Sequence, residues 1–174
     1  MERTEQIKTS FERNAKAIAL RPSVGHGTAK TRVTLREGLT CDVQDGAWKL
    51  VVDASQKSGG DGSAPDPGVY GRTALGSCLA IGYGMWAATL GVSFTSLQVE
   101  VQADYDGGGM YAVTDEPPGY RQVRVIVTVE SDASEADVRK VIAEADAHSP
   151  YLDVFTRAVD VRRDVKIVSL KSEV

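Results

Sequence analysis

The 174-residue sequence has only two cysteines, Cys41 and Cys78, and only two histidines. Two cysteines are too few for a framework of structural disulfides. The four residues also lack the spacing of zinc ligands, so we expect neither a metal nor a cofactor. The first residues, of mixed charge, do not form the apolar segment of a signal peptide, and we expect a cytoplasmic protein. In that reducing compartment, thiol chemistry would be catalytic or redox-linked rather than structural.

Basic charge is also scarce, and this argues against a nucleic-acid partner. The chain has 20 Lys and Arg against 24 Asp and Glu, for a net charge of −4. No basic stripe with interleaved aromatic residues is present. The glycine-rich segment 58–68 has neither the phosphate-binding loop motif nor the dinucleotide-binding motif. We therefore expect it to be a mobile linker.

No Asp, Glu, Lys or Arg occurs from Thr73 to Gln98. This run is long enough to span a bilayer, but glycines interrupt it and its second part alternates as a strand does. We therefore expect no membrane span, but a buried helix over 69–90 followed by a strand over 92–105. Because this helix is apolar on every side, it must be covered on every side. A second subunit is the economical cover, which predicts a homodimer.

The other elements are predicted from periodicity and from turn and capping residues. They are a helix over 3–20, strands over 28–36, 39–43 and 47–53, a polar turn over 107–120, a strand over 121–130, a helix that begins at Asp132 or Ser134, a short helix from Pro150 and a strand at about 159–168. Runs of strands and helices, rather than strict alternation, favour an α+β fold with an antiparallel sheet. We divide the chain into an N-terminal helical extension, 1–26, and one domain, 27–174.

Residues 67–78, P-G-V-Y-G-R-T-A-L-G-S-C, resemble the central-helix motif of the OsmC/Ohr family of osmotically inducible and organic hydroperoxide resistance proteins. That motif runs from a proline to a cysteine eleven positions later, as from Pro67 to Cys78. A second family motif, Cys-Pro, opens a later helix, where this chain has Ser149 and Pro150. With the order of elements, the resemblance covers roughly residues 27–170. It implies an OsmC-like intertwined dimer, with the antiparallel sheet packed on the long central helix.

The resemblance also implies thiol chemistry in which a cysteine attacks a hydroperoxide. In the family a second cysteine resolves the sulfenic acid, a dithiol reduces the disulfide, an arginine holds the thiolate and a glutamate holds that arginine. Cys78 matches the peroxidatic cysteine, whereas Ser149 replaces the second cysteine and Gly68 replaces the glutamate. Arg36 and Arg72 are the candidates for the arginine. These matches predict a peroxidase with Cys78 as its nucleophile and an external dithiol reductant.

Alternatives remain open at this point, because a free cysteine is often simply a small core residue. A thiol in an apolar helix ionises poorly unless a cation or a helix N-terminus compensates for its burial. One alternative is therefore a non-enzymatic protein that binds a small apolar or electrophilic ligand between its subunits. Tyr83, Trp86, Tyr151 and Ser149 are candidates for lining such a pocket. Cys41 is an alternative resolving thiol for the enzyme.

Overall fold

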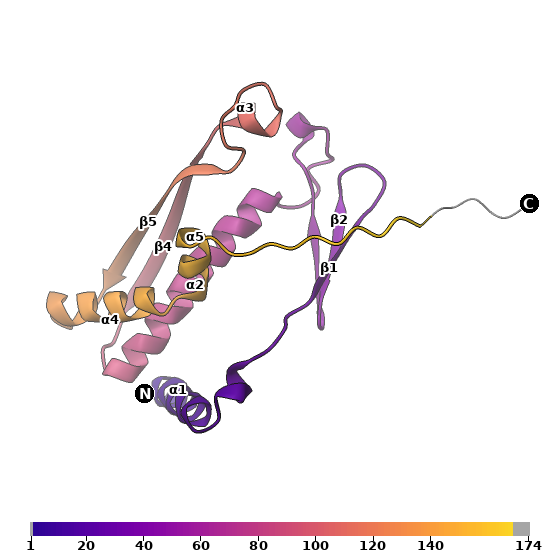
Figure 1. The fold of residues 1–174 in the computed structure, drawn as a ribbon. Coiled ribbons are helices and arrows are strands. Elements are labelled where there is room, and N and C mark those ends of the chain that lie inside the picture. Colours follow the sequence, from indigo (N-terminus) through magenta and orange to yellow (C-terminus); the bar gives the residue numbers. More distant parts are fainter. Residues whose placement is uncertain (1, 169–174) are drawn as a thin grey trace, which may run out of the picture.

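The computed structural model describes residues 2–168 and contains both helices and antiparallel sheets, as the sequence predicts (Figure 1). The elements are α1 (Glu2–Leu20), η1 (Pro22–Gly25), β1 (Thr31–Leu35), β2 (Cys41–Asp45), β3 (Trp48–Val52), η2 (Gln56–Ser58), α2 (Pro67–Leu90), β4 (Ser96–Tyr105), α3 (Gly107–Met110), β5 (Tyr120–Glu130), α4 (Glu135–Ala147) and α5 (Pro150–Thr156). The predicted α+β fold class is confirmed. The one-turn helix α3 and the short η1 and η2 were not predicted.

Helix α2 is the centre of the fold, and its ends follow from local sequence. The Asp66 carboxylate accepts a hydrogen bond from the Val69 backbone N–H at 2.9 Å, and Pro67 occupies the first turn. Gly91 ends the helix with φ of 72°, a conformation that favours glycine. By length and composition alone α2 could cross a membrane. However, Leu75 and Leu79 are 1% exposed in the hydrophobic core, so packing inside the domain accounts for the apolar composition.

The β4–β5 hairpin packs on one side of α2 (Figure 1). Its register places apolar residues opposite one another, with Val99 paired to Val127 and Val101 to Val125. These valines share one face and contact the core residues of α2. The predicted alternation of both strands is therefore confirmed, and its physical cause is burial of one face against the helix.

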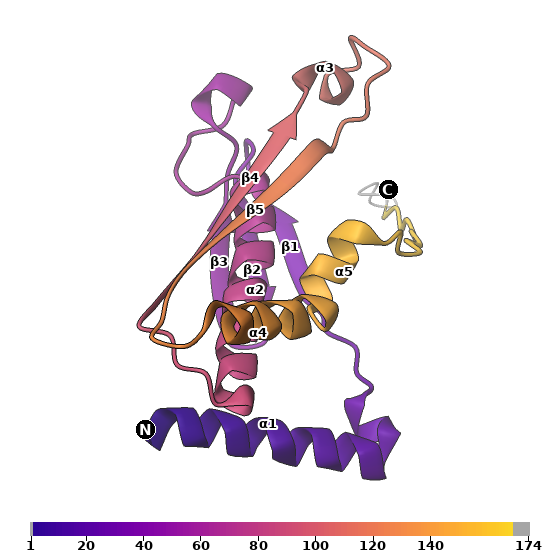
Figure 2. The same cartoon turned by 90° about the vertical axis from the view of Figure 1, so that its left-hand side faces the viewer.

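Helices α4 and α5 cover the same core from another direction (Figure 2). Ser134 is the N-cap of α4 and accepts a hydrogen bond from the Asp137 backbone N–H at 3.2 Å. Val141 and Ala145 of α4 are buried, as their spacing predicts. A sharp junction at Ser149 then starts α5, which also contacts α2.

Strands β1, β2 and β3 form a separate three-stranded antiparallel sheet beyond the other side of α2 (Figure 1). Val33, Val43 and Leu50 are aligned across the three strands and therefore lie on one face. Within residues 2–168 this face is exposed, with Val33 58% and Trp48 75% exposed. An apolar sheet face of this kind is normally buried against another element.

The segment between β3 and α2 joins this sheet to the start of the central helix. The buried Asp53 carboxylate accepts hydrogen bonds from the backbone N–H and hydroxyl of Ser63, at 2.9 and 2.8 Å. The first of these bonds is the main cause of the lowered pKa of Asp53. The Tyr70 hydroxyl on α2 donates to the Val51 carbonyl of β3 at 2.8 Å. The glycine-rich stretch 58–68 is thus part of a hydrogen-bonded loop, a feature that its composition did not predict.

Helix α1 lies across the C-terminal end of α2 (Figure 2). The Phe11 ring meets the Trp86 ring edge to face, with centroids 5.2 Å apart. The N-terminal extension therefore docks on the core of its own chain. The other end of α1 is more open, with Ile18 45% and Leu20 78% exposed.

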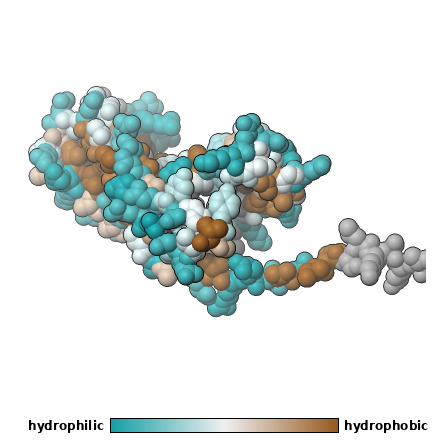
Figure 3. All heavy atoms as spheres, turned by 90° about the horizontal axis from the view of Figure 1, so that it is seen from above, coloured by the Kyte–Doolittle hydropathy of each residue, from teal (hydrophilic) through white to brown (hydrophobic). Residues whose placement is uncertain are grey.

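The predicted strand over 159–168 is wrong for the single chain, because these residues adopt no regular secondary structure. A strand needs a neighbouring strand to accept and donate its backbone hydrogen bonds. Within residues 2–168, no other segment runs alongside this one as a ladder partner. Its alternating apolar residues are exposed, with Val161 at 82% and Ile167 at 90%, and they form the brown stretch before the grey atoms in Figure 3.

Candidate functional site

Cys78 lies in the fourth turn of α2, at the border between its buried and its exposed sides. The thiol is half-buried and free. Its Sγ is 3.6 Å from the hydroxyl oxygen of Ser149, which belongs to the junction between α4 and α5. The two residues are 71 positions apart in sequence. The structure therefore brings together the two positions that the family motifs single out.

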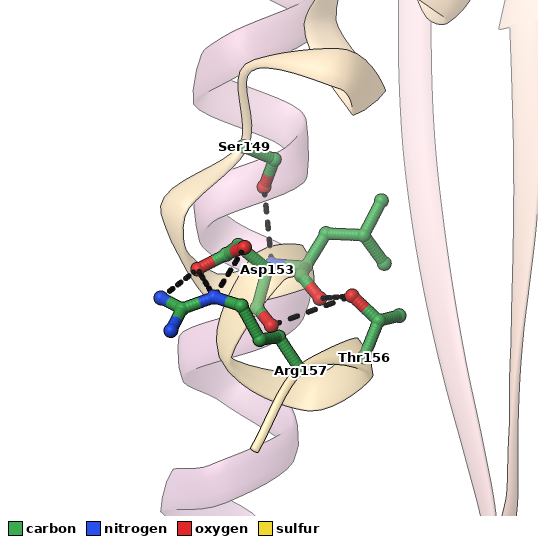
Figure 4. Close-up of polar contacts among 5 residues, drawn as sticks. Ser149, Asp153, Thr156 and Arg157 are labelled. Atoms are coloured by element: carbon green, nitrogen blue, oxygen red, sulfur yellow. Dashed lines mark hydrogen bonds and ion pairs between the residues drawn. The ribbon is translucent and has the colours of Figure 1, made fainter. Parts of the chain in front are cut away.

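Ser149 is buried, with 6% of its surface exposed. Its Oγ accepts a hydrogen bond from the Leu152 backbone N–H at 3.3 Å, so it is the N-cap of α5, as predicted (Figure 4). Pro150 occupies the first turn, where a missing N–H costs nothing. Asp153 and Arg157 pair one turn further on, also seen in Figure 4, and this pairing lowers the pKa of Asp153.

Arg72 lies near the N-terminus of α2 and is held by Tyr120 of β5. Its guanidinium donates to the Tyr120 hydroxyl at 3.3 Å, and that hydroxyl donates to the Gly68 carbonyl at 3.3 Å. A Cβ atom on Gly68 would lie 3.2 Å from the Arg72 guanidinium. The guanidinium therefore takes up space beside the position at which the family's glutamate side chain would start.

Arg36 is ion-paired with Asp42 across the β1–β2 turn. The hydrogen bond from Arg36 lowers the pKa of Asp42, and the same bond raises the pKa of Arg36. Both side chains are about half exposed. In the described part of one chain, the hydrogen bond of Cys78 Sγ goes to Ser149 and to neither arginine. The role of either arginine at the thiol thus stays a prediction.

The aromatic candidates occupy three different environments. Tyr83 is 1% exposed and donates its hydroxyl proton to Asp146 of α4 at 2.8 Å. Trp86 lies between the rings of Phe11 and His148, each with its centroid 5.2 Å away. Tyr151 on α5 is 45% exposed. In the single chain Tyr83 is therefore a core residue, whereas Tyr151 is open to a ligand or to a partner.

Several partners of these residues were missed by sequence reasoning. Asp146 and Tyr120 bond to residues 63 and 48 positions away, a separation at which no local pattern gives a signal. Cys41 is half-buried on β2 opposite Val52. It belongs to the three-stranded sheet and not to the group around Cys78.

A comparison with protein families matches residues 60–163 to the OsmC family, described as OsmC-like protein. This range is more than half of the chain and includes Cys78 and Ser149. The chain belongs to the OsmC-like family. The match leaves out α1 and the three-stranded sheet of this OsmC-like protein.

Solved structures of similar fold include an OsmC-like protein from Mycoplasma pneumoniae, with a TM-score of 0.64, 15% identity and coverage of 74% of this chain and 87% of that one. An organic hydroperoxide resistance protein OsmC from Legionella pneumophila has a TM-score of 0.55 and 16% identity, with coverage of 75% and 90%. A putative organic hydroperoxide resistance protein from Vibrio cholerae, with captopril bound in one of its active sites, has a TM-score of 0.53 and 14% identity, with coverage of 75% and 85%. No curated protein sequence matches the chain. At these identities the structural likeness shows the shared fold.

We predict that Tyr83→Phe lowers the free energy of unfolding by about 1–3 kcal/mol, because the hydrogen bond from the buried Tyr83 hydroxyl to the half-buried Asp146 carboxylate is lost. Burial, and then the bond to Asp146, raise the pKa of Tyr83 in the folded state. A tyrosine in the unfolded chain ionises near pH ~10. As the pH rises, Tyr83 therefore loses its proton in the unfolded state before it does so in the folded state. The contribution of Tyr83 is thus complete below that pH and falls as the pH rises above it.

Urea denaturation of the wild type and Tyr83→Phe, from roughly pH 8 to pH 11, measures both effects. The difference in stability between the two proteins should shrink as the pH rises. Tyr151→Phe, which alters an exposed tyrosine, is the control and should follow the wild type. A difference that stays constant across this range would contradict the prediction.

Proposed function

We propose that this OsmC-like protein acts in oxidative-stress metabolism and reduces organic hydroperoxides through Cys78. The observation that carries the proposal is the 3.6 Å contact between Cys78 and Ser149, at the two motif positions of a chain with the family's fold. Fold neighbours described as organic hydroperoxide resistance proteins support this substrate class. Cys78 is free and half-buried rather than fully enclosed in the core, as a reactive thiol must be.

The first step is a nucleophilic displacement at oxygen. The Cys78 thiolate attacks one oxygen of the hydroperoxide, an S–O bond forms and the O–O bond breaks. The alkoxide leaves and takes up a proton to become an alcohol, while the sulfur, oxidised by two electrons, becomes a sulfenic acid. The protein supplies the nucleophile and holds it beside the Ser149 hydroxyl.

The second half of the cycle needs an external dithiol, because a serine hydroxyl cannot resolve a sulfenic acid as a disulfide. One thiol of the reductant attacks the sulfenic sulfur, an S–S bond forms and water leaves. Its second thiol then displaces Cys78 as a thiolate and closes a disulfide within the reductant. Cys41 lies on the other sheet, away from this group. A reducing cytoplasm is the compartment that would supply such a dithiol.

We also propose that the working form is a homodimer, because two surfaces rich in apolar residues are exposed within residues 2–168. One is a stripe on α2 at four-residue spacing, in which Val69 is 37%, Ile81 63% and Met85 38% exposed and the uncharged Thr73 and Ser77 lie between them. The other is the face of the three-stranded sheet that carries Val33 and Leu50. The stripe on α2 carries no charge, and on the sheet face a single carboxylate, Asp45, lies beside Val43. A second copy supplies apolar surface to match both.

A second candidate function is binding without turnover. The observation in its favour is that neither Arg36 nor Arg72 bonds to the Cys78 sulfur in the described part of the chain. The Vibrio cholerae neighbour was solved with a small molecule in one of its active sites. On this alternative, the site around Cys78 holds an apolar or electrophilic ligand, and the thiol is not oxidised in a cycle.

We predict that cumene hydroperoxide converts Cys78 to a sulfenic acid, which a dimedone-type probe traps and mass spectrometry locates. Cys78→Ser should abolish labelling and dithiol-dependent peroxide turnover, because no other thiol lies at the site. Cys41→Ser is the matched control and should retain both. An unlabelled Cys78, or full turnover in Cys78→Ser, would leave the binding alternative.

We predict that the wild type is a dimer by size-exclusion chromatography with light scattering. Ile81→Lys should dissociate it, because a buried unpaired charge costs several kcal/mol. The control is Ile126→Lys, an exposed isoleucine on the outer face of β5 opposite Glu100. This second variant should stay dimeric. A monomeric wild type, or equal behaviour of the two variants, would count against the proposed interface.

A further inference from the structure

We infer that the Ser149 hydroxyl is the hydrogen-bond donor that stabilises the ionised thiol of Cys78. The inference deepens the proposed function, since it concerns the same site, and it assigns Ser149 a role in place of a resolving cysteine. It starts from two facts. The hydroxyl is 3.6 Å from the sulfur, and it is 94% removed from solvent, being 6% exposed.

The direction of this hydrogen bond follows from what else the hydroxyl does. A serine hydroxyl has one proton to donate and two lone pairs to accept with. The Leu152 backbone N–H donates to the oxygen at 3.3 Å and so occupies a lone pair. The proton remains free for another acceptor, and the Cys78 sulfur is within reach of it. An ionised sulfur has no proton of its own, so in that state the serine must be the donor.

The charged and titratable groups around the pair have other partners. On α2, Arg72 donates to Tyr120. On α4, Asp146 accepts from Tyr83, and at the junction the His148 Nδ1 is bonded to the Glu144 carbonyl at 2.7 Å. On α5, Asp153 is paired with Arg157. In the described residues of one chain, the hydroxyl is thus the polar group that contacts the sulfur.

This arrangement also determines what happens to an oxidised sulfur. A cysteine at position 149 would capture the sulfenic acid as an intramolecular disulfide. A hydroxyl keeps its hydrogen bond to the sulfenic acid or its anion and forms no bond with the sulfur. The same side chain therefore favours ionisation and leaves the oxidised sulfur open to an external thiol.

The test is the pH dependence of Cys78 alkylation by iodoacetamide in the Cys41→Ser protein, followed by mass spectrometry. Loss of a hydrogen bond to a charged group should move the midpoint of Ser149→Ala up by about one pH unit and slow alkylation about tenfold below the midpoint. Ser149→Thr keeps the hydroxyl and should restore the wild-type profile. Ser77→Ala removes an exposed hydroxyl next to Cys78 that bonds to the Ala74 carbonyl, and it should change nothing.

Ser149→Ala also removes the cap of α5, so a structural effect must be separated from an electrostatic one. Loosening of α5 would expose the thiol and speed alkylation, whereas loss of the donor slows it below the midpoint. The inference is overturned if Ser149→Ala keeps the wild-type midpoint or if Ser149→Thr shifts as far as Ser149→Ala does. It would also be overturned if Ser149→Cys formed no intramolecular disulfide with Cys78 on oxidation, because the two side chains would then not be adjacent.

Failure of this inference differs from failure of the proposed function. If sulfenic acid never forms at Cys78 but the alkylation midpoint depends on Ser149, the hydrogen bond is real and the peroxidase proposal fails. If sulfenic acid forms and the midpoint does not depend on Ser149, the peroxidase proposal stands and another group must stabilise the thiolate.

Discussion

Burial of one side of α2 against β4, β5 and α4 is the constraint on which the rest of the structure depends. Leu75, Leu79 and Tyr83 form this contact, and the valines of the hairpin pack against it. The hydrogen bond from Tyr83 to Asp146 fixes the position of α4 along the axis of α2. Ser149 directly follows the end of α4. The position of α4 along α2 therefore determines which α2 side chain the Ser149 hydroxyl contacts, and that side chain is Cys78.

From Thr73 onward the opposite side of α2 is also free of charged residues, but within residues 2–168 it is exposed. Its exposed stripe, the open face of the three-stranded sheet and the extended residues 159–168 share this condition. These three regions expose apolar side chains or strand backbone without a partner strand to solvent. Proteins usually bury such surfaces by associating with a second chain. The wrong strand prediction and the dimer proposal therefore concern the same feature: apolar positions that are exposed within residues 2–168 and that a second copy would cover in the proposed dimer.

Local signals predicted much of the fold. Short stretches of sequence predicted the proline at the start of α5, Ser149 as its cap, a cap at Asp132 or Ser134 for α4, and the alternation of the β4–β5 strands, because these features depend on neighbouring residues. The candidate site was predictable only in part, since the nearness of Cys78 and Ser149 followed from the family resemblance and not from spacing. The hydrogen bonds from Tyr83 to Asp146 and from Ser63 to Asp53 join residues that no local sequence pattern connects. Their geometry depends on tertiary packing.

The two departures from the family motifs have different physical consequences. At Gly68 a Cβ atom would lie 3.2 Å from the Arg72 guanidinium, which donates to the Tyr120 hydroxyl. Arg36 has its own carboxylate partner in Asp42. With both guanidiniums bonded elsewhere in the described part of the chain, an ionised sulfur would depend on the uncharged hydroxyl of Ser149, whose attraction to a negative charge is weaker than that of a cation at the same distance. Serine in place of cysteine at position 149 therefore bears on both halves of the proposed cycle. In the first half its hydroxyl donates to the ionised sulfur, and in the second half it forms no disulfide, so the sulfenic acid reacts with the external dithiol.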